Sequence, residues 1–371
     1  MGGTVRFPII RAIVVLMAPC WRGNARSLGK RCFMRKVVLT APYTLEMAQA
    51  PVPEITDGQV LLKVKYIGIC GSDIQMYHGL HKYMTYPVVI GHEVAAVVEK
   101  VGRDVSGYAA GDLVTVQPQV SCGSCYPCLS GRPNVCEKLK VRGVHKDGFA
   151  CEYYAIDASF LHPCPGLETE HATLVEPLAV GVGAVKRAGD IRGKNVVVVG
   201  AGTIGNLVAQ SAQALGAGHV MLTDMKQKKL DYAKQCGVEF CVNTTDTTLK
   251  EAINSRFGVR RADVIIDCAA TRGSLLSVLD AARPSSKIVI TGNFKAPVEI
   301  ELPVLQRQEI ELIGHMMYVR EDYQDAIRFI QQGKVSLQGF VSGRYPVEQL
   351  AEAFAFIDAQ PDDVMKILVS L

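Results

Sequence analysis

The sequence predicts an α/β protein of two domains, one rich in short β-strands and one built on a doubly wound parallel sheet of six strands. Three observations indicate this architecture. A chain of 371 residues is long for a single hydrophobic core. Short β-type runs separated by turn residues fill positions 34 to 120, whereas apolar strands alternate with helical stretches from position 195. Hydrophobic residues make up 49% of the chain, as in a globular protein.

The first domain is expected to be a small antiparallel barrel or sandwich. Its apolar runs are separated by turn signals such as Asp57-Gly58 and Gly111-Asp112, a pattern typical of strands joined by tight turns. The domain should extend over 34–182, with a separate lobe at about 120–137. Beyond a first strand that starts near Met34, its strands are expected at 60–66, 88–90, 94–101 and 113–116.

The second domain, expected at 183–314, should hold six parallel strands with helices on both faces. Its strands are continuous apolar runs, as expected when neither face of the sheet meets water. They lie at 196–199, 220–223, 240–242, 264–266, 288–290 and 310–313. The last part of the chain, 315–371, should return to the first domain. It contains helical patterns at 321–332, capped by Gly333, and 347–359, and a closing strand at 365–369.

The charge distribution argues against a nucleic-acid partner. The formal net charge is +4, but residues 1–33 hold six Arg and Lys and no acid, so the rest of the chain carries −2. No basic stripe remains to follow a phosphate backbone. The apolar run at 9–18 is interrupted by Arg11 and is shorter than the ~20 residues of a membrane span. We interpret residues 1–33 as a non-native extension translated from an upstream start, with a targeting peptide as the alternative.

Four of the twelve cysteines lie in one tight cluster. Cys122, Cys125, Cys128 and Cys136 have the spacing C-x2-C-x2-C-x7-C in a loop rich in Gly, Pro and Ser. Four thiolates on a short lobe are typical of a closed, tetrahedral structural zinc site, and buried or oxidised cysteines are the alternative. In a chain of this size without a convincing secretory signal, this cysteine usage favours metal binding and a reducing cytoplasm.

A second, dispersed set of residues has the composition of a catalytic zinc site. It comprises Cys70 in GICGSD (68–73), His92 in GHE (91–93) and Glu176 in VEP (175–177). One thiolate, one imidazole and one carboxylate leave a coordination position open for a substrate. Taken singly, each has an ordinary alternative as a buried thiol, a satisfied histidine or an acid at a helix start. Together with the cysteine lobe they predict a zinc centre.

A glycine-rich turn predicts a dinucleotide site. Gly200-Ala201-Gly202-Thr203-Ile204-Gly205 follows the strand at 196–199 and opens a helix, whose free N–H groups suit a pyrophosphate. This motif alone is a weak signal. Asp224 ends the next strand, where a carboxylate accepts hydrogen bonds from ribose hydroxyls and repels a 2′-phosphate, so NAD is expected rather than NADP. Three lysines beyond it could hold a phosphate, but we interpret them as solvated charges on a surface helix. They are Lys226, Lys228 and Lys229.

Together these motifs resemble those of the zinc-containing medium-chain dehydrogenases, and the resemblance covers 34–371. Within the family, the chain most resembles the polyol, sugar-acid, threonine and butanediol dehydrogenase branch, because it has the glutamate of VEP where liver-type alcohol dehydrogenases carry a cysteine. The segment 121–136, followed by RGVHKDG, is similar to bacterial sugar-acid 5-dehydrogenases and the starvation-sensing dehydrogenase. The resemblance implies a GroES-like catalytic domain interrupted by a Rossmann domain, and a homodimer or homotetramer.

Three positions depart from the family pattern. Gln75 stands five residues after Cys70, where many relatives carry the histidine that ends a proton relay, so the relay should finish on water or on His78 or His81. Met316-Met317-Tyr318 stands where sorbitol-type enzymes often carry an arginine and a tyrosine, which argues against sorbitol as the substrate. Asp147-Gly148-Phe149-Ala150 replaces the usual double glycine and phenylalanine, and the sequence offers no functional account of it.

The expected function is reversible, zinc-dependent oxidation of a secondary alcohol in a polyol or sugar acid, with hydride transfer to NAD. Two Zn²⁺ per chain are expected, one on the lobe and one on Cys70, His92 and Glu176. Ser72 should relay the hydroxyl proton, and Glu93 should be an intermittent ligand or a carboxylate that tunes the zinc. A threonine 3-dehydrogenase or a 2,3-butanediol-type dehydrogenase is one alternative. A non-catalytic, zinc-stabilised nucleotide-binding protein is another, and it predicts one zinc and no redox turnover.

Overall fold

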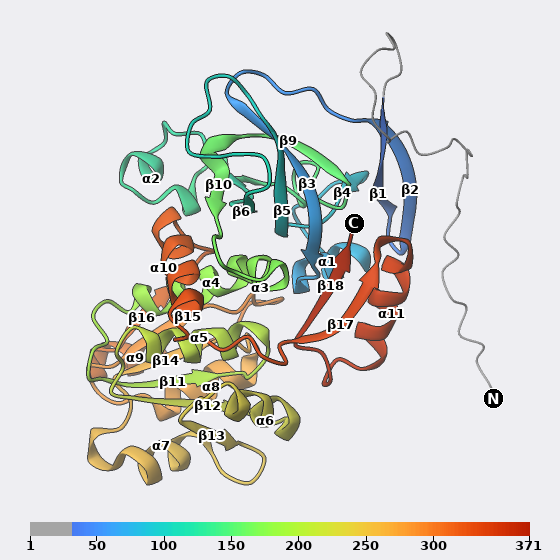
Figure 1. Ribbon diagram of the computed structural model, residues 1–371. Helices are drawn as coiled ribbons and strands as arrows, with labels where there is room; N and C mark the ends of the chain where they lie inside the picture. Colours follow the sequence, from blue (N-terminus) through green and yellow to red (C-terminus); the bar gives the residue numbers. More distant parts are fainter. Residues whose placement is uncertain (1–31) are drawn as a thin grey trace, which may run out of the picture.

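The computed structural model describes residues 32–371 and contains the two predicted domains (Figure 1). The β-rich domain combines the first and last parts of the chain, and the parallel-sheet domain is inserted between them in sequence. Apart from Cys32 and Phe33, the prediction for residues 1–33 lies outside the described residues. Phe33 already belongs to the first strand. No helix within 32–371 is long and apolar enough to cross a membrane.

The β-rich domain contains sheets of seven, three and two strands. The seven-stranded sheet has the order β10-β6-β5-β3-β18-β17, and β9 also pairs with β3. Its strands are β3 (Gln59–Gly68), β5 (Glu93–Val101), β6 (Leu113–Val116), β9 (Tyr153–Asp157), β10 (Leu161–Pro163), β17 (Val341–Pro346) and β18 (Lys366–Ser370). The three-stranded sheet, in the order β2-β1-β4, holds β1 (Phe33–Ala41), β2 (Thr44–Pro51) and β4 (Val88–Val89), and the two-stranded sheet holds β7 (Gln119–Val120) and β8 (Lys140–Val141).

The predicted closing strand does return to the first domain. β18 pairs antiparallel with β3 and parallel with β17. The helices of this domain are α1 (Gly71–Tyr77), α2 (Tyr126–Leu129), α3 (Thr169–Thr173) and α11 (Leu350–Ala359), with 3₁₀ turns at Pro133–Val135, Ala158–Phe160 and Val347–Gln349. The helical pattern expected at 347–359 is therefore a 3₁₀ turn followed by α11.

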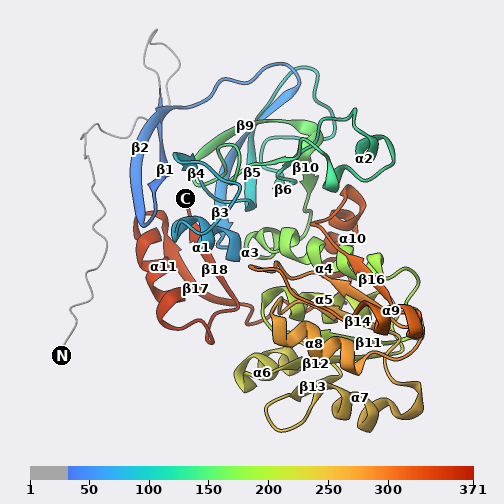
Figure 2. The same cartoon turned by 180° about the vertical axis from the view of Figure 1, so that it is seen from behind.

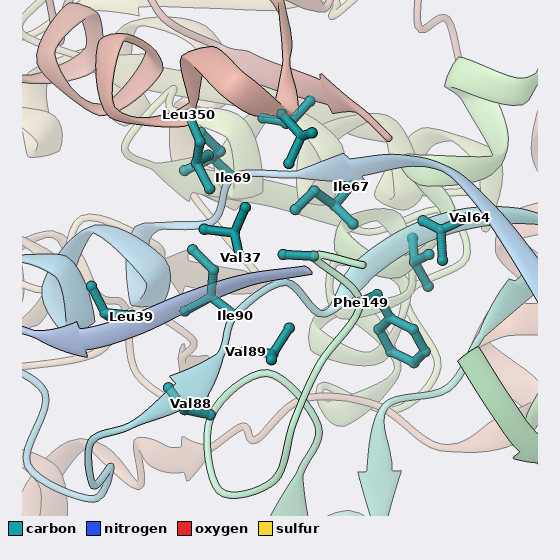
Figure 3. Packing of buried hydrophobic residues seen from close by; sticks show 14 of the residues in the cluster. Val37, Leu39, Val64, Ile67, Ile69, Val88, Val89, Ile90, Phe149 and Leu350 are labelled. Atoms are coloured by element: carbon teal, nitrogen blue, oxygen red, sulfur yellow. The ribbon is translucent and has the colours of Figure 1, made fainter. Parts of the chain in front are cut away.

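One apolar cluster forms the core of the β-rich domain and includes residues next to the predicted zinc ligands in the sequence. Figure 3 shows Ile67, Ile69 and Ile90 in the same cluster, with Phe149 beside them. Ile69 immediately precedes Cys70, and Ile90 is two residues before His92. Because side chains packed in a core have little freedom to shift, this cluster fixes the two ligand-bearing segments relative to one another.

The inserted domain is a six-stranded parallel sheet, as predicted, and its strand order is β13-β12-β11-β14-β15-β16. Its strands are β11 (Asn195–Val199), β12 (His219–Asp224), β13 (Phe240–Asn243), β14 (Val264–Asp267), β15 (Lys287–Ile290) and β16 (Glu311–Gly314). Its helices are α5 (Thr203–Ala214), α6 (Gln227–Gln235), α7 (Leu249–Phe257), α8 (Arg272–Ala281) and α9 (Leu302–Gln308), with a 3₁₀ turn at Gly258–Arg260.

Both faces of the parallel sheet are covered, which explains the continuous apolar strands. Val196 and Val198 pack with residues of α5 and α6 on one face. Val197 packs with residues of α7 and α8 on the other face. Strand order reverses between β11 and β14, and the carboxyl ends of strands at such a point form a ligand-binding crevice in doubly wound sheets.

Two helices lie between the sheets of the two domains (Figures 1 and 2). They are α4 (Val175–Arg187) and α10 (Arg320–Gln331), and they pack against each other. Helix α4 contacts β5 of the β-rich domain and α5 of the inserted domain. Gly333, at a positive φ of 64°, follows α10 as predicted.

Candidate active site

The glycine-rich turn has the geometry of a dinucleotide-binding loop. Gly200 has a φ of +96°, and a Cβ on Gly205 would lie 1.6 Å from the carbonyl oxygen of Gly200, so neither position accepts a side chain. A Cβ on Gly202 would meet no atom within 4 Å. The turn is therefore closed on its protein side and open where α5 begins. Thr203 donates its hydroxyl hydrogen bond to the carbonyl of Met365, and Ile204 packs against the domain core.

Asp224 is held in place at the end of β12 by two backbone N–H groups. Its Oδ2 accepts from Ala201 at 2.6 Å, within the glycine turn, and its Oδ1 accepts from Lys226 at 2.8 Å. The turn and the carboxylate thus form one unit, as a ribose-binding acid requires. Of the lysines that follow, Lys226 and Lys228 are exposed as expected, but Lys229 is buried. Our interpretation of Lys229 as a solvated charge was wrong, because its ammonium group donates to the carbonyl of Val364.

The cysteine lobe brings its four thiols together. The ligand atoms of Cys122, Cys125, Cys128 and Cys136 all lie within 4.8 Å of one another. The backbone N–H groups of Cys122 and Lys138 donate to the Cys136 sulfur at 3.3 Å, and hydrogen bonds from Ser124 lower the pKa of Cys122 to about 5. All cysteines between residues 32 and 371 are free. Four thiols at such distances, with N–H donors that favour thiolate, fit a tetrahedral zinc ion.

A second group that could hold a metal ion combines Cys70, His92 and Glu93. Their ligand atoms also lie within 4.8 Å of one another. His92 and Glu93 are buried, at 5% and 1% exposed. One carboxylate oxygen of Glu93 has no hydrogen-bond partner among the described residues. A thiol, an imidazole and a carboxylate oriented toward one point fit a three-ligand zinc centre with an open position.

Glu176 is near this group but does not belong to it by distance. It is 4% exposed and lies in the first turn of α4. Burial, followed by the negative charge of Glu93, raises the pKa of Glu176 to about 7, while His92 acts in the opposite direction. The Tyr318 hydroxyl donates to Glu176 Oε1. Of the two glutamates, Glu93 is the one whose carboxylate lies close to Cys70 and His92.

The segment 143–150 supports the loop that carries His92. A Cβ on Gly148 would lie 2.3 Å from the carbonyl oxygen of Gly91, and one on Gly143 would lie 2.5 Å from it. Asp147 accepts a hydrogen bond from the backbone N–H of Val89 at 3.1 Å. The unexplained departure at 147–150 thus has a structural role, since it packs backbone against backbone just before His92.

Three charged or polar groups around the candidate metal ligands were not predicted from the sequence. Lys366 of β18 is 3% exposed and pairs with Glu93 at 2.6 Å. Burial acts to lower the pKa of Lys366, but Glu93 outweighs it and raises the pKa. Asp73 lies 3.5 Å from His92 Nδ1 and accepts from the Cys70 N–H at 2.8 Å. Burial acts to lower the pKa of His92, and the charge of Asp73 more than reverses this. Tyr318, on Glu176, is the third.

The structure also locates the residues considered for a proton relay. Ser72 Oγ lies 3.5 Å from His92 Nε2, beside the candidate metal site. His78 is occupied by an ion pair with Asp358 at 2.9 Å. Burial, followed by the charge of His145, lowers the pKa of His81, and Asp73 and His92 also act on it.

Comparison with known proteins agrees with this geometry. Residues 56–166 match the family model of the alcohol dehydrogenase GroES-like domain, and residues 203–332 match that of zinc-binding dehydrogenases. The chain is 33% identical over 314 residues, 84% of its length and 91% of the relative's, to 2-dehydro-3-deoxy-L-galactonate 5-dehydrogenase of Pseudoalteromonas atlantica. It is 34% identical over 342 residues, 90% of its length and 97% of the relative's, to sorbitol dehydrogenase of Bombyx mori.

A solved structure shows the same arrangement of the two domains. It is the alcohol dehydrogenase RspB of Escherichia coli CFT073, which was crystallised with NADH. The TM-score is 0.84 at 28% identity, and the match covers 91% of this chain and 99% of the other.

Proposed function

Because the chain belongs to the zinc-type medium-chain dehydrogenase family, we propose that it oxidises a secondary alcohol in a polyol or sugar acid reversibly and passes the hydride to NAD. The observation that carries this proposal is the convergence of Cys70, His92 and Glu93 within 4.8 Å. It supplies a metal-binding set with an open position. The glycine turn and Asp224 supply a dinucleotide site in the same chain.

Two zinc ions are proposed for each chain. The catalytic ion is assigned to Cys70, His92 and a glutamate, with Glu93 and Glu176 as the two candidates for the third ligand. The structural ion is assigned to the four cysteines of the lobe. Two carboxylates near one metal ion permit an exchange of ligands when substrate enters, which supports the role expected for Glu93 as an intermittent ligand.

In the proposed mechanism, zinc supplies Lewis acidity that lowers the pKa of the substrate hydroxyl, and NAD supplies the hydride acceptor. Ser72, 3.5 Å from His92, accepts the hydroxyl proton and passes it toward solvent. Gln75 cannot titrate, so His81 is the group we assign to the outer end of this relay. Asp73 accepts a hydrogen bond from the Cys70 N–H and lies 3.5 Å from His92 Nδ1, so its carboxylate supports the Cys70 backbone and places a negative charge beside the imidazole.

NAD is proposed over NADP because Asp224 ends β12 beside the glycine turn, and a carboxylate at that position would accept hydrogen bonds from ribose hydroxyls and repel a 2′-phosphate. Its two oxygens are fixed by backbone N–H groups, so the carboxylate cannot swing away from a phosphate without losing both bonds. We also propose a homodimer or homotetramer in a reducing cytoplasm, in line with the family and the free cysteines.

A substrate panel tests the proposal. Aldonates, polyols, threonine and 2,3-butanediol are offered with NAD and with NADP, and zinc is counted by metal analysis. We expect two zinc ions per chain and turnover of a sugar acid or polyol with NAD. Turnover confined to threonine or butanediol would show that the substrate is not a polyol or sugar acid, and would favour the threonine 3-dehydrogenase or butanediol-type alternative. One zinc per chain without any redox turnover would support the non-catalytic alternative instead.

A further inference from the structure

The three lysines that follow Asp224 are in contact with the C-terminal return of the chain. Lys226 pairs with Asp362 at 2.8 Å, and Lys228 pairs with Asp363 at 2.5 Å. Lys229, buried beneath them, donates to the carbonyl of Val364. The segment 362–365, between α11 and β18, therefore lies along the start of α6, although more than 130 residues separate the partners in sequence.

This contact lies beside the carboxylate proposed to bind the adenosine ribose. Asp224 accepts from the backbone N–H of Lys226, so the lysine and the carboxylate share one turn. The ion pair with Asp362 raises the pKa of Lys226, and Asp224 adds a smaller effect of the same sign. If Asp224 binds the ribose, Lys226 is the cation beside the ribose hydroxyls.

The charges of this region balance. Three lysines and three carboxylates lie together here; two of the carboxylates, Asp362 and Asp363, form ion pairs with lysines, and the third, Asp224, accepts from backbone N–H groups. A 2′-phosphate adds between one and two negative charges, and tight phosphate sites normally provide free cations to receive them. Here Lys226 and Lys228 are already paired, and Lys229 is turned inward to a carbonyl. To bind Lys226 or Lys228, a phosphate would have to displace the carboxylate that is paired with that lysine, and the displaced carboxylate would remain close to the phosphate.

We propose that Asp362 and Asp363 are cofactor-specificity residues, which occupy the cations of Lys226 and Lys228 and so deny them to a 2′-phosphate. The proposal rests on the proposed NAD site at Asp224 and extends it to a segment outside the parallel-sheet domain. Selection against NADP then has two parts. Asp224 repels the 2′-phosphate directly, and Asp362 and Asp363 neutralise the lysines that could otherwise bind it.

Binding of adenosine fragments tests this proposal without the need for catalysis or zinc. 2′,5′-ADP and 5′-AMP differ only in the 2′-phosphate, so the ratio of their dissociation constants, measured by calorimetry, reports on that group alone. The Asp224→Ser variant serves as the background, since it removes the carboxylate that would repel the 2′-phosphate directly. Adding D362N and D363N to it should shift the ratio toward 2′,5′-ADP by about tenfold, because Lys226 and Lys228 can then pair with the phosphate.

Two further measurements identify the cause of the shift. Adding K226M and K228M should remove it, since the freed cations are then absent. Raising the salt concentration to about 0.5 M should reduce it, because exposed charges are screened. The matched control is Asp280→Asn, which removes the same charge from an exposed ion pair with Lys250 on another part of the domain, and it should leave the ratio unchanged.

The possible failures are distinguishable. If D362N and D363N leave the ratio as it was, or if Asp280→Asn shifts it equally, the specificity role is wrong while the NAD site stands. If the unmodified protein binds neither 5′-AMP nor NADH, the proposed cofactor site itself is wrong. If it prefers 2′,5′-ADP, both the assignment of NAD and the role of Asp362 and Asp363 are overturned.

Discussion

The two metal-ligand groups of this chain are built in opposite ways. The lobe collects four thiols from one short segment, residues 122–136, and three of the four are partly exposed. The Cys70 group collects unlike side chains from separate segments, two of the three are buried, and Asp73, Glu176 and Lys366 lie around it. A closed site of identical ligands can be made by one short loop. A buried site with an open position needs the whole domain to supply and balance its charges.

Because of that difference, the two groups should respond differently to the loss of one ligand. The largest effect we expect is a loss of turnover when Cys70 is replaced. Cys70→Ser should lower kcat/KM by at least about a thousandfold, because the Lewis acid contributes several kcal/mol to the reaction. Its thermal midpoint should change little. Cys125→Ser should do the reverse, with the loss of one zinc ion and a lower midpoint but less than about a tenfold loss of turnover. Equal losses of turnover would remove the distinction.

The ion pair between Lys366 and Glu93 tests whether the buried group depends on charge balance. Lys366→Met leaves a buried carboxylate unpaired and should lower the free energy of unfolding by about 3 to 5 kcal/mol, measured by urea denaturation. Lys366→Arg, which keeps the charge, is the control. In the double variant with Glu93→Gln the loss should be smaller than in Lys366→Met alone. An equal loss would show that packing, and not charge, is responsible.

Acid sensitivity should arise partly outside both metal groups. His162 is stacked on Tyr323 at 4.5 Å, and burial lowers its pKa from 6.5 to about 3. The unfolded chain therefore takes up a proton first, so stability is retained above pH 6.5 and falls as the pH drops from there toward 3. Between about pH 6.5 and 4.5 the loss should be about 2 to 3 kcal/mol.

His162→Phe keeps the stacked ring and removes the titrating group, so it should lose about 2 to 3 kcal/mol less than the unmodified protein over that range. Chemical denaturation at several pH values measures the difference. His219→Gln, a change at an exposed histidine, is the control. If His162→Phe has the same pH profile as the unmodified protein, the acid response belongs to the metal groups or to other residues.

The smallest effect is expected from Tyr318, which acts on the site only through Glu176. Tyr318→Phe removes one hydrogen bond to that carboxylate and should lower turnover or zinc affinity by about tenfold. Tyr323→Phe is the matched control, because this equally buried hydroxyl donates to the carbonyl of Val116 instead. If the two variants lose the same activity, Tyr318 has a role in packing and not in orienting Glu176.

The parts of the candidate site that could be predicted are those formed by residues close together in the sequence. The lobe follows from the spacing of four cysteines, and the dinucleotide turn from three glycines and a strand. Cys70 and His92 could be singled out as candidate ligands because each lies in a short motif, and the structure brings them together. The parallel strands were predictable too, because burial on both faces leaves uninterrupted apolar runs.

The partners of those residues could not be predicted, because only the fold brings them together. Lys366 is 273 residues from Glu93, and Tyr318 is 142 residues from Glu176. Strand β17 was missed because its sequence, VSGRYP, contains Gly and Pro, which weaken a strand pattern. Lys229 looked like any surface lysine, since nothing local indicates that Val364 covers it.

The position of β18 has a consequence for synthesis on the ribosome. The parallel-sheet domain is one uninterrupted stretch of chain, so it can fold as soon as that stretch has been translated. The β-rich domain must wait, because the strand that pairs with β3 and carries Lys366 is translated after the whole of its neighbour. During that interval the carboxylate of Glu93 lacks its cation. A nascent chain should therefore be able to complete its proposed dinucleotide site before the proposed site at Cys70, His92 and Glu93 is complete.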